Sequence, residues 1–343
     1  MATWADTTIA EIRLARQVLG DLQLPATTVF VGGGTPTRLP PAELGRVLQA
    51  IRSEFGVAAG AEVTVEANPD DVTEHLLAGL LAAGANRISL GMQSAVPETL
   101  QTLDRTHRSA ELPAVADRIR RSGMDRFSVD LIYGTPGESQ AQLRRTLEAA
   151  VSLAPGHISA YCLGIEPGTR MGAQVRAGAL APVDQDAAAD RYLLCDEVLA
   201  ANGYSWYEIS NWARPGQECR HNLAYWQGDS WWGVGPGAHS HIAGVRWWNR
   251  RHPRAWSAAL AAGDSPAAGM EALTPGQQRD ERVLLGIRLR AGLPVGLVEG
   301  GRDSVAAWVE QGWAEWLQDK PAAFRLTRRG RLIADRLALE AVG

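Results

Sequence analysis

Five short apolar runs in this chain each end in a cluster of glycine, polar or acidic residues, and this repeated ending constrains the fold more than any other feature. Segments with helical periodicity lie between the runs. In a parallel α/β barrel, every strand delivers the residues at its end to one shared face. The pattern therefore predicts a barrel with one site built from these five endings, which follow residues 29–31, 63–65, 88–90, 127–129 and 157–160.

The chain begins with a predicted helix over 7–19, where a barrel unit would place a strand. We therefore expect a partial parallel barrel that lacks its first strand. Its sixth recognisable strand is expected at 205–209. The helices between the strands are expected at 41–55, 73–81, 109–122, 140–153 and 184–202.

Three units are predicted along the chain. The partial barrel occupies residues 1–212. Residues 213–270 are rich in Trp, Gly and His, are expected to form loops or short antiparallel strands, and complete the side of the barrel. Residues 271–343 are expected to form a smaller α+β domain, because helices near 280–289 and 304–311, a strand at 323–326 and a final helix from 327 are typical of a winged-helix-like module.

Composition excludes several classes of protein. A net charge of -4 does not predict the broad positively charged surface that binds nucleic acid. The basic clusters 250–254 and 328–331 are interpreted as solvated surface. No apolar run reaches membrane-spanning length, and three cysteines argue against a disulfide framework and for a reducing cytoplasm. Twelve tryptophans, seven of them between 206 and 248, favour either core packing or an aromatic wall for a flat ligand.

The strand endings carry the candidate site residues. Glycines 32–34 allow close backbone approach to a ligand. Glu66 supplies an anionic acceptor, unless it forms an internal salt bridge with Arg87. Gln93, Arg105 and Asp130 add an amide, a cation and a second carboxylate. This set suits a zwitterionic ligand with a ribose and an amino-acid head group.

Six ordered motifs resemble one family from about residue 28 to the C-terminus: GGGTP, EANP, RISLGMQS, LDRTH, FSVDLIYGTPG and HISAY. The family is the radical SAM group of oxygen-independent coproporphyrinogen III oxidases. Residues 221–226, HNLAYW, are similar to the HNxxYW mark of its HemW-like heme chaperone subgroup. The segments YEISN and GVGPGAHS also resemble that subgroup.

The resemblance implies a set of ligand contacts. Gly33, Gly34 and Thr35 would meet the methionine part of S-adenosylmethionine through the backbone, and Cys162 stands where the family places a small residue beside the adenine. Further family binding positions match Glu66, Gln93, Arg105 and Asp130. The candidates for an axial heme ligand are His221 and His239.

The implied function is binding of heme and its delivery to an acceptor protein in the cytoplasm. The alternative is oxidative decarboxylation of coproporphyrinogen III to protoporphyrinogen IX. The resemblance gives neither the oligomeric state nor the heme acceptor.

The sequence departs from the family at its cluster loop. The family holds a 4Fe-4S cluster with a CxxxCxxC loop, whereas the cysteines here are Cys162, Cys195 and Cys219, and Cys195 is expected to be a small buried apolar residue. Either the sequence begins after the first strand and the cluster loop, or the chain is a cluster-free paralogue. We expect the first, because strand and loop are missing together. Whether the chain is an enzyme stays open, and as printed it is not expected to perform radical chemistry.

Overall fold

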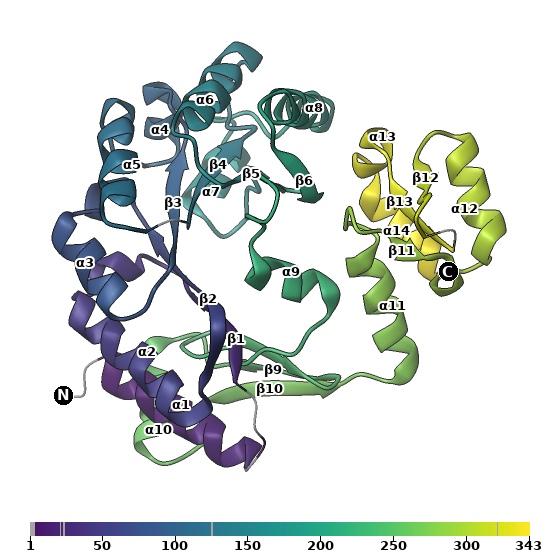
Figure 1. The fold of residues 1–343 in the computed structure, drawn as a ribbon. Coiled ribbons are helices and arrows are strands. Elements are labelled where there is room, and N and C mark those ends of the chain that lie inside the picture. The colour runs from purple at the N-terminus through teal and green to yellow at the C-terminus, as the bar shows by residue number, and fades with distance from the viewer. Residues whose placement is uncertain (1–3, 21, 23–24, 125, 321) are drawn as a thin grey trace.

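A curved seven-stranded sheet organises the N-terminal part of the chain in the computed structural model, which describes residues 4–20, 22, 25–124, 126–320 and 322–343 (Figure 1). The strand order is β1–β2–β3–β4–β5–β7–β6, and β1 to β5 pair in parallel. The strands are β1 (Ala26–Val31), β2 (Val57–Ala67), β3 (Arg87–Gln93), β4 (Arg126–Tyr133), β5 (His157–Cys162), β6 (Ser205–Glu208) and β7 (Asn211–Ala213).

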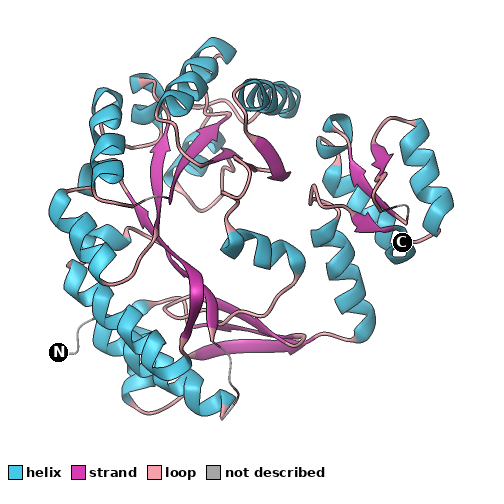
Figure 2. Cartoon of the chain, viewed as in Figure 1, coloured by secondary structure: helices cyan, strands magenta, loops and turns pink. Residues whose placement is uncertain are grey.

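Helices cover the outer face of this sheet (Figure 2). Several begin where the sequence provides a cap: the Thr73 hydroxyl accepts from Leu76 N at 3.1 Å, and Ser139 forms a capping box with Gln142. The elements are α1 (Trp4–Leu19), η1 (Pro36–Arg38), α2 (Pro41–Phe55), η2 (Pro69–Asp71), α3 (Glu74–Ala82), α4 (Pro97–Thr102), η3 (Ser109–Glu111), α5 (Leu112–Arg121), α6 (Gln140–Ser152), α7 (Arg170–Arg176) and α8 (Gln185–Ala201).

Side-chain alternation separates the core from the concave face of the sheet. Ile88 and Leu90 on β3, with Val129 on β4, are fully buried in the main core beneath the helices. Their neighbours Ser89 and Asp130 face the other way, because successive strand residues point to opposite faces. The concave face therefore collects the polar residues of the strands.

The predicted α/β partial parallel barrel is confirmed, with one difference at its far edge. A sixth strand lies where it was expected, but β7 inserts between β5 and β6 and runs antiparallel to both. The hairpin is closed by Glu208, whose carboxylate accepts from Ser210 N at 3.0 Å and from the Asn211 side chain. A strand as short as β7 gives no periodic signal of its own.

The Trp, Gly and His-rich segment forms an antiparallel sheet together with two helices that were not predicted. Its elements are α9 (Arg220–Gln227), β8 (His239–Ile242), β9 (Val245–Asn249), α10 (Pro253–Ala261) and β10 (Ala267–Ala272). The buried Glu11 of α1 ties this segment down, accepting from Gly235 N at 2.8 Å, Asn249 at 2.6 Å and Trp256 at 2.8 Å. Of the two alternatives given for this segment, the structure has short antiparallel strands rather than irregular loops. Both helices are short, and their helical signal is correspondingly weak.

The C-terminal part of the chain has its own hydrophobic core and a small antiparallel sheet of order β11–β13–β12 (Figure 1). This agrees with the expected α+β unit, although the boundaries at 212 and 270 remain predictions. Its last helix is broken in two. The elements are α11 (Pro275–Gly286), β11 (Leu293–Pro294), η4 (Val295–Leu297), α12 (Gly301–Glu310), β12 (Ala314–Trp316), β13 (Ala323–Leu326), α13 (Arg328–Arg331) and α14 (Ala334–Val342).

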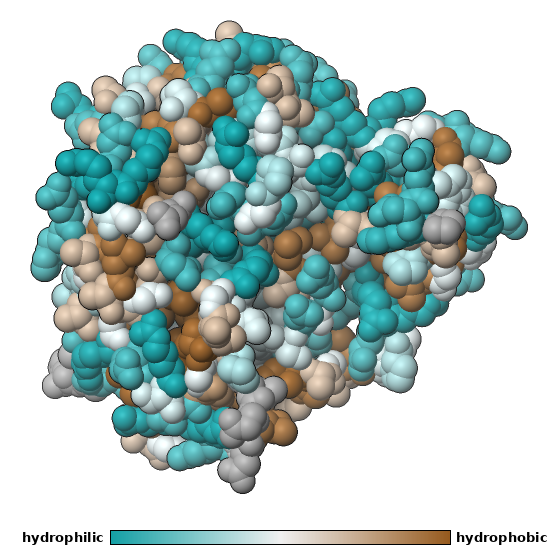
Figure 3. All heavy atoms as spheres, viewed as in Figure 1, coloured by the Kyte–Doolittle hydropathy of each residue, from teal (hydrophilic) through white to brown (hydrophobic). Residues whose placement is uncertain are grey.

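Polar and charged residues cover most of the face drawn in Figure 3, and the hydrophobic patches on it are small and separate. Among the described residues, no helix combines the length and the hydropathy needed to cross a membrane. The basic cluster 328–331 is not simply solvated surface, as the sequence suggested. Arg331 is buried and binds Asp196 of α8 through Nη1–Oδ1 and Nη2–Oδ2 contacts of 2.9 and 2.8 Å.

Replacing Arg331 with methionine should destabilise the chain by about 3–5 kcal/mol, because it leaves the Asp196 carboxylate buried without its main partner. Urea unfolding followed by circular dichroism measures the loss. The control is Arg328→Ala, whose side chain contacts the same carboxylate but is 43% exposed, so the expected cost is below about 1 kcal/mol. Equal losses in the two variants would contradict this assignment.

Candidate functional site

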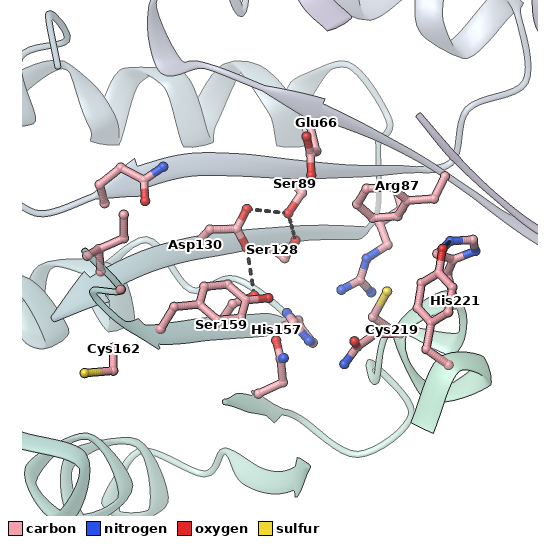
Figure 4. A pocket seen from close by; sticks show the side chains of 18 of the residues that line it. Glu66, Arg87, Ser89, Ser128, Asp130, His157, Ser159, Cys162, Cys219 and His221 are labelled. Carbon is pink, nitrogen blue, oxygen red and sulfur yellow. Dashed lines mark hydrogen bonds between the residues drawn. The ribbon is translucent and has the colours of Figure 1, made fainter. Parts of the chain in front are cut away.

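The concave face of the sheet encloses a cavity of about 440 Å³ (Figure 4). Its walls come from β1 to β5 and β7, with α9 and the residue before it closing one side. Five of the predicted site residues line it, namely Glu66, Gln93, Asp130, Cys162 and His221. The remaining lining includes Phe30, Arg87, Ser89, Ser128, His157, Ser159, Tyr161, Asn211, Cys219, Asn222 and Tyr225.

The glycine loop after β1 lies against Glu66. Gly33 N donates to Glu66 Oε2 at 3.0 Å, and burial raises the pKa of this carboxyl although the Gly33 hydrogen bond opposes the rise. Gly33 and Gly34 have φ values of +85° and +65°, which side chains rarely adopt. A Cβ on Gly32 would lie 2.7 Å from the Phe30 ring. The loop therefore requires glycine, and it places Gly33 and Gly34, with Thr35 following, at the border of the cavity rather than in its lining.

Asp130 is held by hydroxyl groups from the two neighbouring strands. Ser89 Oγ donates to Asp130 Oδ2 at 2.6 Å, and Ser159 Oγ donates to Oδ1 at 2.7 Å. Ser128 Oγ extends the network to Ser89 at 2.8 Å. Burial raises the pKa of Asp130, while the two serine hydrogen bonds and the Arg87 charge oppose the rise. The carboxylate is thus fixed in orientation, as a hydrogen-bond acceptor for a ligand requires.

Gln93 enters the cavity through a strained backbone. Its φ is +59°, a left-handed value for a residue that is not glycine. The pairing of β3 with β4 shifts register between Leu90 and Gln93, which turns the end of the strand. Strain of this kind persists where the surrounding structure enforces it and is common at ligand sites.

Besides the three residues of the glycine loop, two predicted site residues lie outside the cavity lining. Arg105 is exposed and is not among the lining residues. It follows Asp104, which has a φ of +56°, so the loop after α4 turns toward solvent. His239 on β8 is also exposed, and its ring lies 6.2 Å from that of Trp248. The expectation that Arg105 lines the same cavity as Glu66 is therefore not met, and the ligand roles of both residues stay predictions.

The cysteines do not fit a 4Fe-4S cluster. Cys162 is exposed at the end of β5, Cys195 is fully buried in α8 as expected, and Cys219 precedes α9. Within the described parts of the chain, no group of three His, Cys, Asp or Glu side chains could hold a metal ion. A 4Fe-4S cluster needs three thiolates around one cube, and the three cysteines of this chain do not provide that arrangement.

The alternative of a salt bridge between Glu66 and Arg87 is not met, because Arg87 pairs with Glu62 instead. Arg87 lies at the inner end of the cavity, where its Nη1 is 3.9 Å from Glu62 Oε2 and donates to Gln217 O at 3.2 Å. Glu66 is four residues further along β2 and reaches the glycine loop instead. Glu62 and Glu66 lie on the same face of the strand because their separation is even.

Helix α9 presents His221 to the cavity. His221 Nδ1 lies 2.8 Å from Thr28 Oγ1 of β1, and Nε2 lies 3.0 Å from Tyr225 Oη. The imidazole stacks on Phe30 with ring centroids 5.1 Å apart. Burial lowers the pKa of His221, although the Glu62 charge opposes the effect. The ring is therefore neutral at pH 7, the form that binds metal ions.

Other residues of the HNLAYW segment have structural contacts. Asn222 Nδ2 donates to Tyr207 Oη and to Glu208 Oε1, both at 3.1 Å, and so joins this segment to YEISN. The Arg288 guanidinium of the C-terminal unit lies 6.0 Å from the centre of the Trp226 ring. No tryptophan of the described chain lines the cavity, and of the seven between 206 and 248 only Trp212 is fully buried in the core.

Sequence reasoning missed the deeper polar residues of the cavity. Ser89, Ser128 and Ser159 had not been singled out, and neither had His157. Their signal was the even spacing from predicted residues on the same strand: Ser128 is two residues before Asp130, and Ser89 is four before Gln93. Such residues share a face with the strand ending.

Comparison with known proteins places the chain in a family. It is 44% identical over 342 residues to the protein named heme chaperone HemW of Mycobacterium tuberculosis, a match that covers 99% of this chain and 86% of that relative. The chain belongs to the HemW family. The Lactococcus lactis protein of the same name is 33% identical over 268 residues, covering 78% of this chain and 70% of the relative.

Two further comparisons agree with this membership. Residues 7–150 match the radical SAM superfamily. The solved structure of the Escherichia coli coproporphyrinogen III oxidase HemN, a radical SAM enzyme, superimposes with a TM-score of 0.80 over 98% of this chain and 82% of that one. The two sequences are 21% identical, so this likeness establishes the fold.

Proposed function

We propose that this chain is a cytoplasmic HemW-like protein that binds heme and S-adenosylmethionine and delivers heme to an acceptor protein. The identity of 44% to a protein named heme chaperone HemW, over nearly the whole chain, carries this proposal. The likeness to HemN supports only the fold, so coproporphyrinogen oxidation is the less favoured function.

The mouth of the cavity suits S-adenosylmethionine. The Glu66 carboxylate and the glycine loop offer an anionic acceptor beside exposed backbone, as an amino-acid head group requires. Asp130 and Gln93 supply an oriented carboxylate and an amide for ribose hydroxyls. When bound, S-adenosylmethionine would supply an electrophilic sulfonium. Reduction of that sulfonium would need an electron from a 4Fe-4S cluster, and the described residues offer no set of ligands to hold one, so the role proposed for these side chains is binding alone.

His221 suits a heme iron. Thr28 can accept a hydrogen bond from Nδ1–H, which leaves the lone pair of Nε2 facing the Tyr225 hydroxyl. An iron at Nε2 would take the place of that hydroxyl, while Phe30 continues to support the ring from one face. Partners that fix the tautomer of a histidine ligand are usual in metal sites.

Titration of the purified chain with hemin and, separately, with S-adenosylmethionine tests the proposal. We expect a saturable Soret band and a calorimetric binding isotherm, respectively. A decarboxylation assay with coproporphyrinogen III distinguishes the alternative. Product formation without hemin binding would replace the chaperone proposal with the oxidase.

The His221 imidazole should titrate below its ordinary pKa of 6.5, because burial disfavours its charged form. The neutral form therefore persists as the pH falls through 6.5, and loss of hemin affinity should begin only below that value. Proton NMR of the ring, assigned by comparison with His221→Ala, measures the midpoint. A midpoint above 6.5 would show that the Glu62 charge outweighs burial.

A further inference from the structure

The inner end of the cavity contains a buried arginine with unused hydrogen-bond donors. The Arg87 side chain is 2% exposed, and its Nη1 is occupied by Gln217 O. Its Nε and Nη2 have no hydrogen-bond partner within the described parts of the chain. These two nitrogens form one edge of the planar guanidinium, the edge that can bind both oxygens of a carboxylate. Because buried polar groups nearly always have partners, the free edge indicates a missing acceptor.

The carboxylate nearest to Arg87 is committed elsewhere. Glu62 is fully buried, and its oxygens accept from the start of α9: Arg220 N at 3.2 Å, His221 N at 3.1 Å and the Cys219 thiol at 3.4 Å. These donors offset its charge, since amides at a helix N-terminus stabilise an anion. Glu62 therefore balances the charge of Arg87 from 3.9 Å without filling its free edge.

A second free donor lies at the same end of the cavity, where Figure 4 shows Arg87, His157 and Cys219 close together. His157 is 3% exposed, its Nε2 is 2.8 Å from Tyr207 Oη, and its Nδ1 has no partner among the described residues. Tyr207 Oη already accepts from Asn222, so it can donate its own hydrogen to Nε2. The proton of the neutral ring is then on Nδ1. Burial and the Arg87 charge hold the pKa of His157 well below its usual value.

We propose that this inner end is a carboxylate subsite, in which the Nε and Nη2 edge of Arg87 binds both oxygens of a ligand carboxylate and His157 Nδ1 donates to one of them. Arg87 lies at the start of β3, six residues before Gln93, and pairs with Thr64 of β2, two residues before Glu66.

For a porphyrin ligand the inference rests on the proposed function, since heme carries two propionate carboxylates. The carboxylate subsite itself does not depend on heme. Propionate is therefore the first probe, with uncharged propionamide as its matched control. We expect propionate, at constant ionic strength, to raise the melting temperature of the chain saturably, and propionamide to leave it unchanged.

Variants that change the buried Arg87–Glu62 pair test whether propionate binds at Arg87. Arg87→Met combined with Glu62→Gln removes both members of the buried pair and should weaken propionate binding by at least about 10-fold. Glu62→Gln alone keeps the arginine edge and should bind propionate as well as the unaltered chain, or better. Arg87→Lys, which keeps the charge but lacks the planar edge, should fall between them. Undiminished propionate binding in a folded double variant, or no saturable response in the unaltered chain, would overturn the subsite.

Hemin and hemin dimethyl ester separate this inference from the proposed function. The unaltered chain should prefer hemin at least about 10-fold, and the preference should disappear in the double variant. Tight hemin binding with no preference over the ester would overturn the carboxylate subsite for porphyrin and leave heme binding intact. Propionate binding without hemin binding would support the subsite and refute the proposed function.

Discussion

His221→Ala should lower the affinity of the chain for hemin by about 100-fold and shift the Soret band, because the variant loses the imidazole that faces the cavity. Thr28→Val should lower it by about 10-fold, since Thr28 fixes the ring that would bind iron and outer partners of this kind contribute 10–100-fold in metal affinity. Titration with hemin, followed by absorbance, measures both effects.

The matched control is His239→Ala. His239 was the other candidate from sequence, but its side chain is exposed and outside the cavity, so its removal should leave the spectrum unchanged. Loss of the shifted band in His239→Ala alone would transfer the ligand role to β8. An unchanged spectrum in His221→Ala would make His221 a structural residue that joins α9 to β1 through Thr28.

The parallel part of the sheet was predictable from sequence because each of its strands carries a strong local signal. Apolar runs such as 88–90 lie inside strands and are followed by glycine or polar residues. Helix boundaries were equally clear where caps exist, as at Thr73 and Ser139. Among the elements that were missed, α9 and β7 depend on distant partners. Helix α9 begins at amides that bind Glu62 in β2, and β7 belongs to a hairpin closed by Glu208.

The residues of the candidate site also fall into a group that the sequence could predict and a group that it could not. The mouth residues Glu66 and Gln93 stand at strand endings, where a shared face follows from barrel geometry, and Asp130 lines the same cavity from the middle of β4. Arg87 and His157 lie at the starts of their strands and carry no such signal. Their importance depends on which atoms lack partners, and this is a tertiary property. Arg105 is the opposite case. A sequence motif placed it among the predicted site residues, but its side chain is exposed to solvent, next to the left-handed turn at Asp104.

The 343-residue chain, reconstituted anaerobically with iron and sulfide, should assemble no stable 4Fe-4S cluster and should not cleave S-adenosylmethionine. Three thiolates must converge on one cube, yet the cysteines stand on a strand end, within a helix and before a distant helix. Burial raises the pKa of the Cys195 thiol and raises that of Cys219 to about 11, so both remain protonated and poor metal ligands at pH 7.

Visible absorbance and electron paramagnetic resonance test cluster assembly, and chromatographic detection of 5′-deoxyadenosine tests cleavage. A radical SAM protein that carries the CxxxCxxC loop, treated in parallel, shows that the reconstitution works. Binding of S-adenosylmethionine should survive, because Glu66, Gln93 and Asp130 do not depend on a cluster for their positions. A brown preparation that cleaves S-adenosylmethionine, and loses both properties in Cys162→Ala, would refute the argument from geometry, because Cys162 alone of the three thiols is exposed.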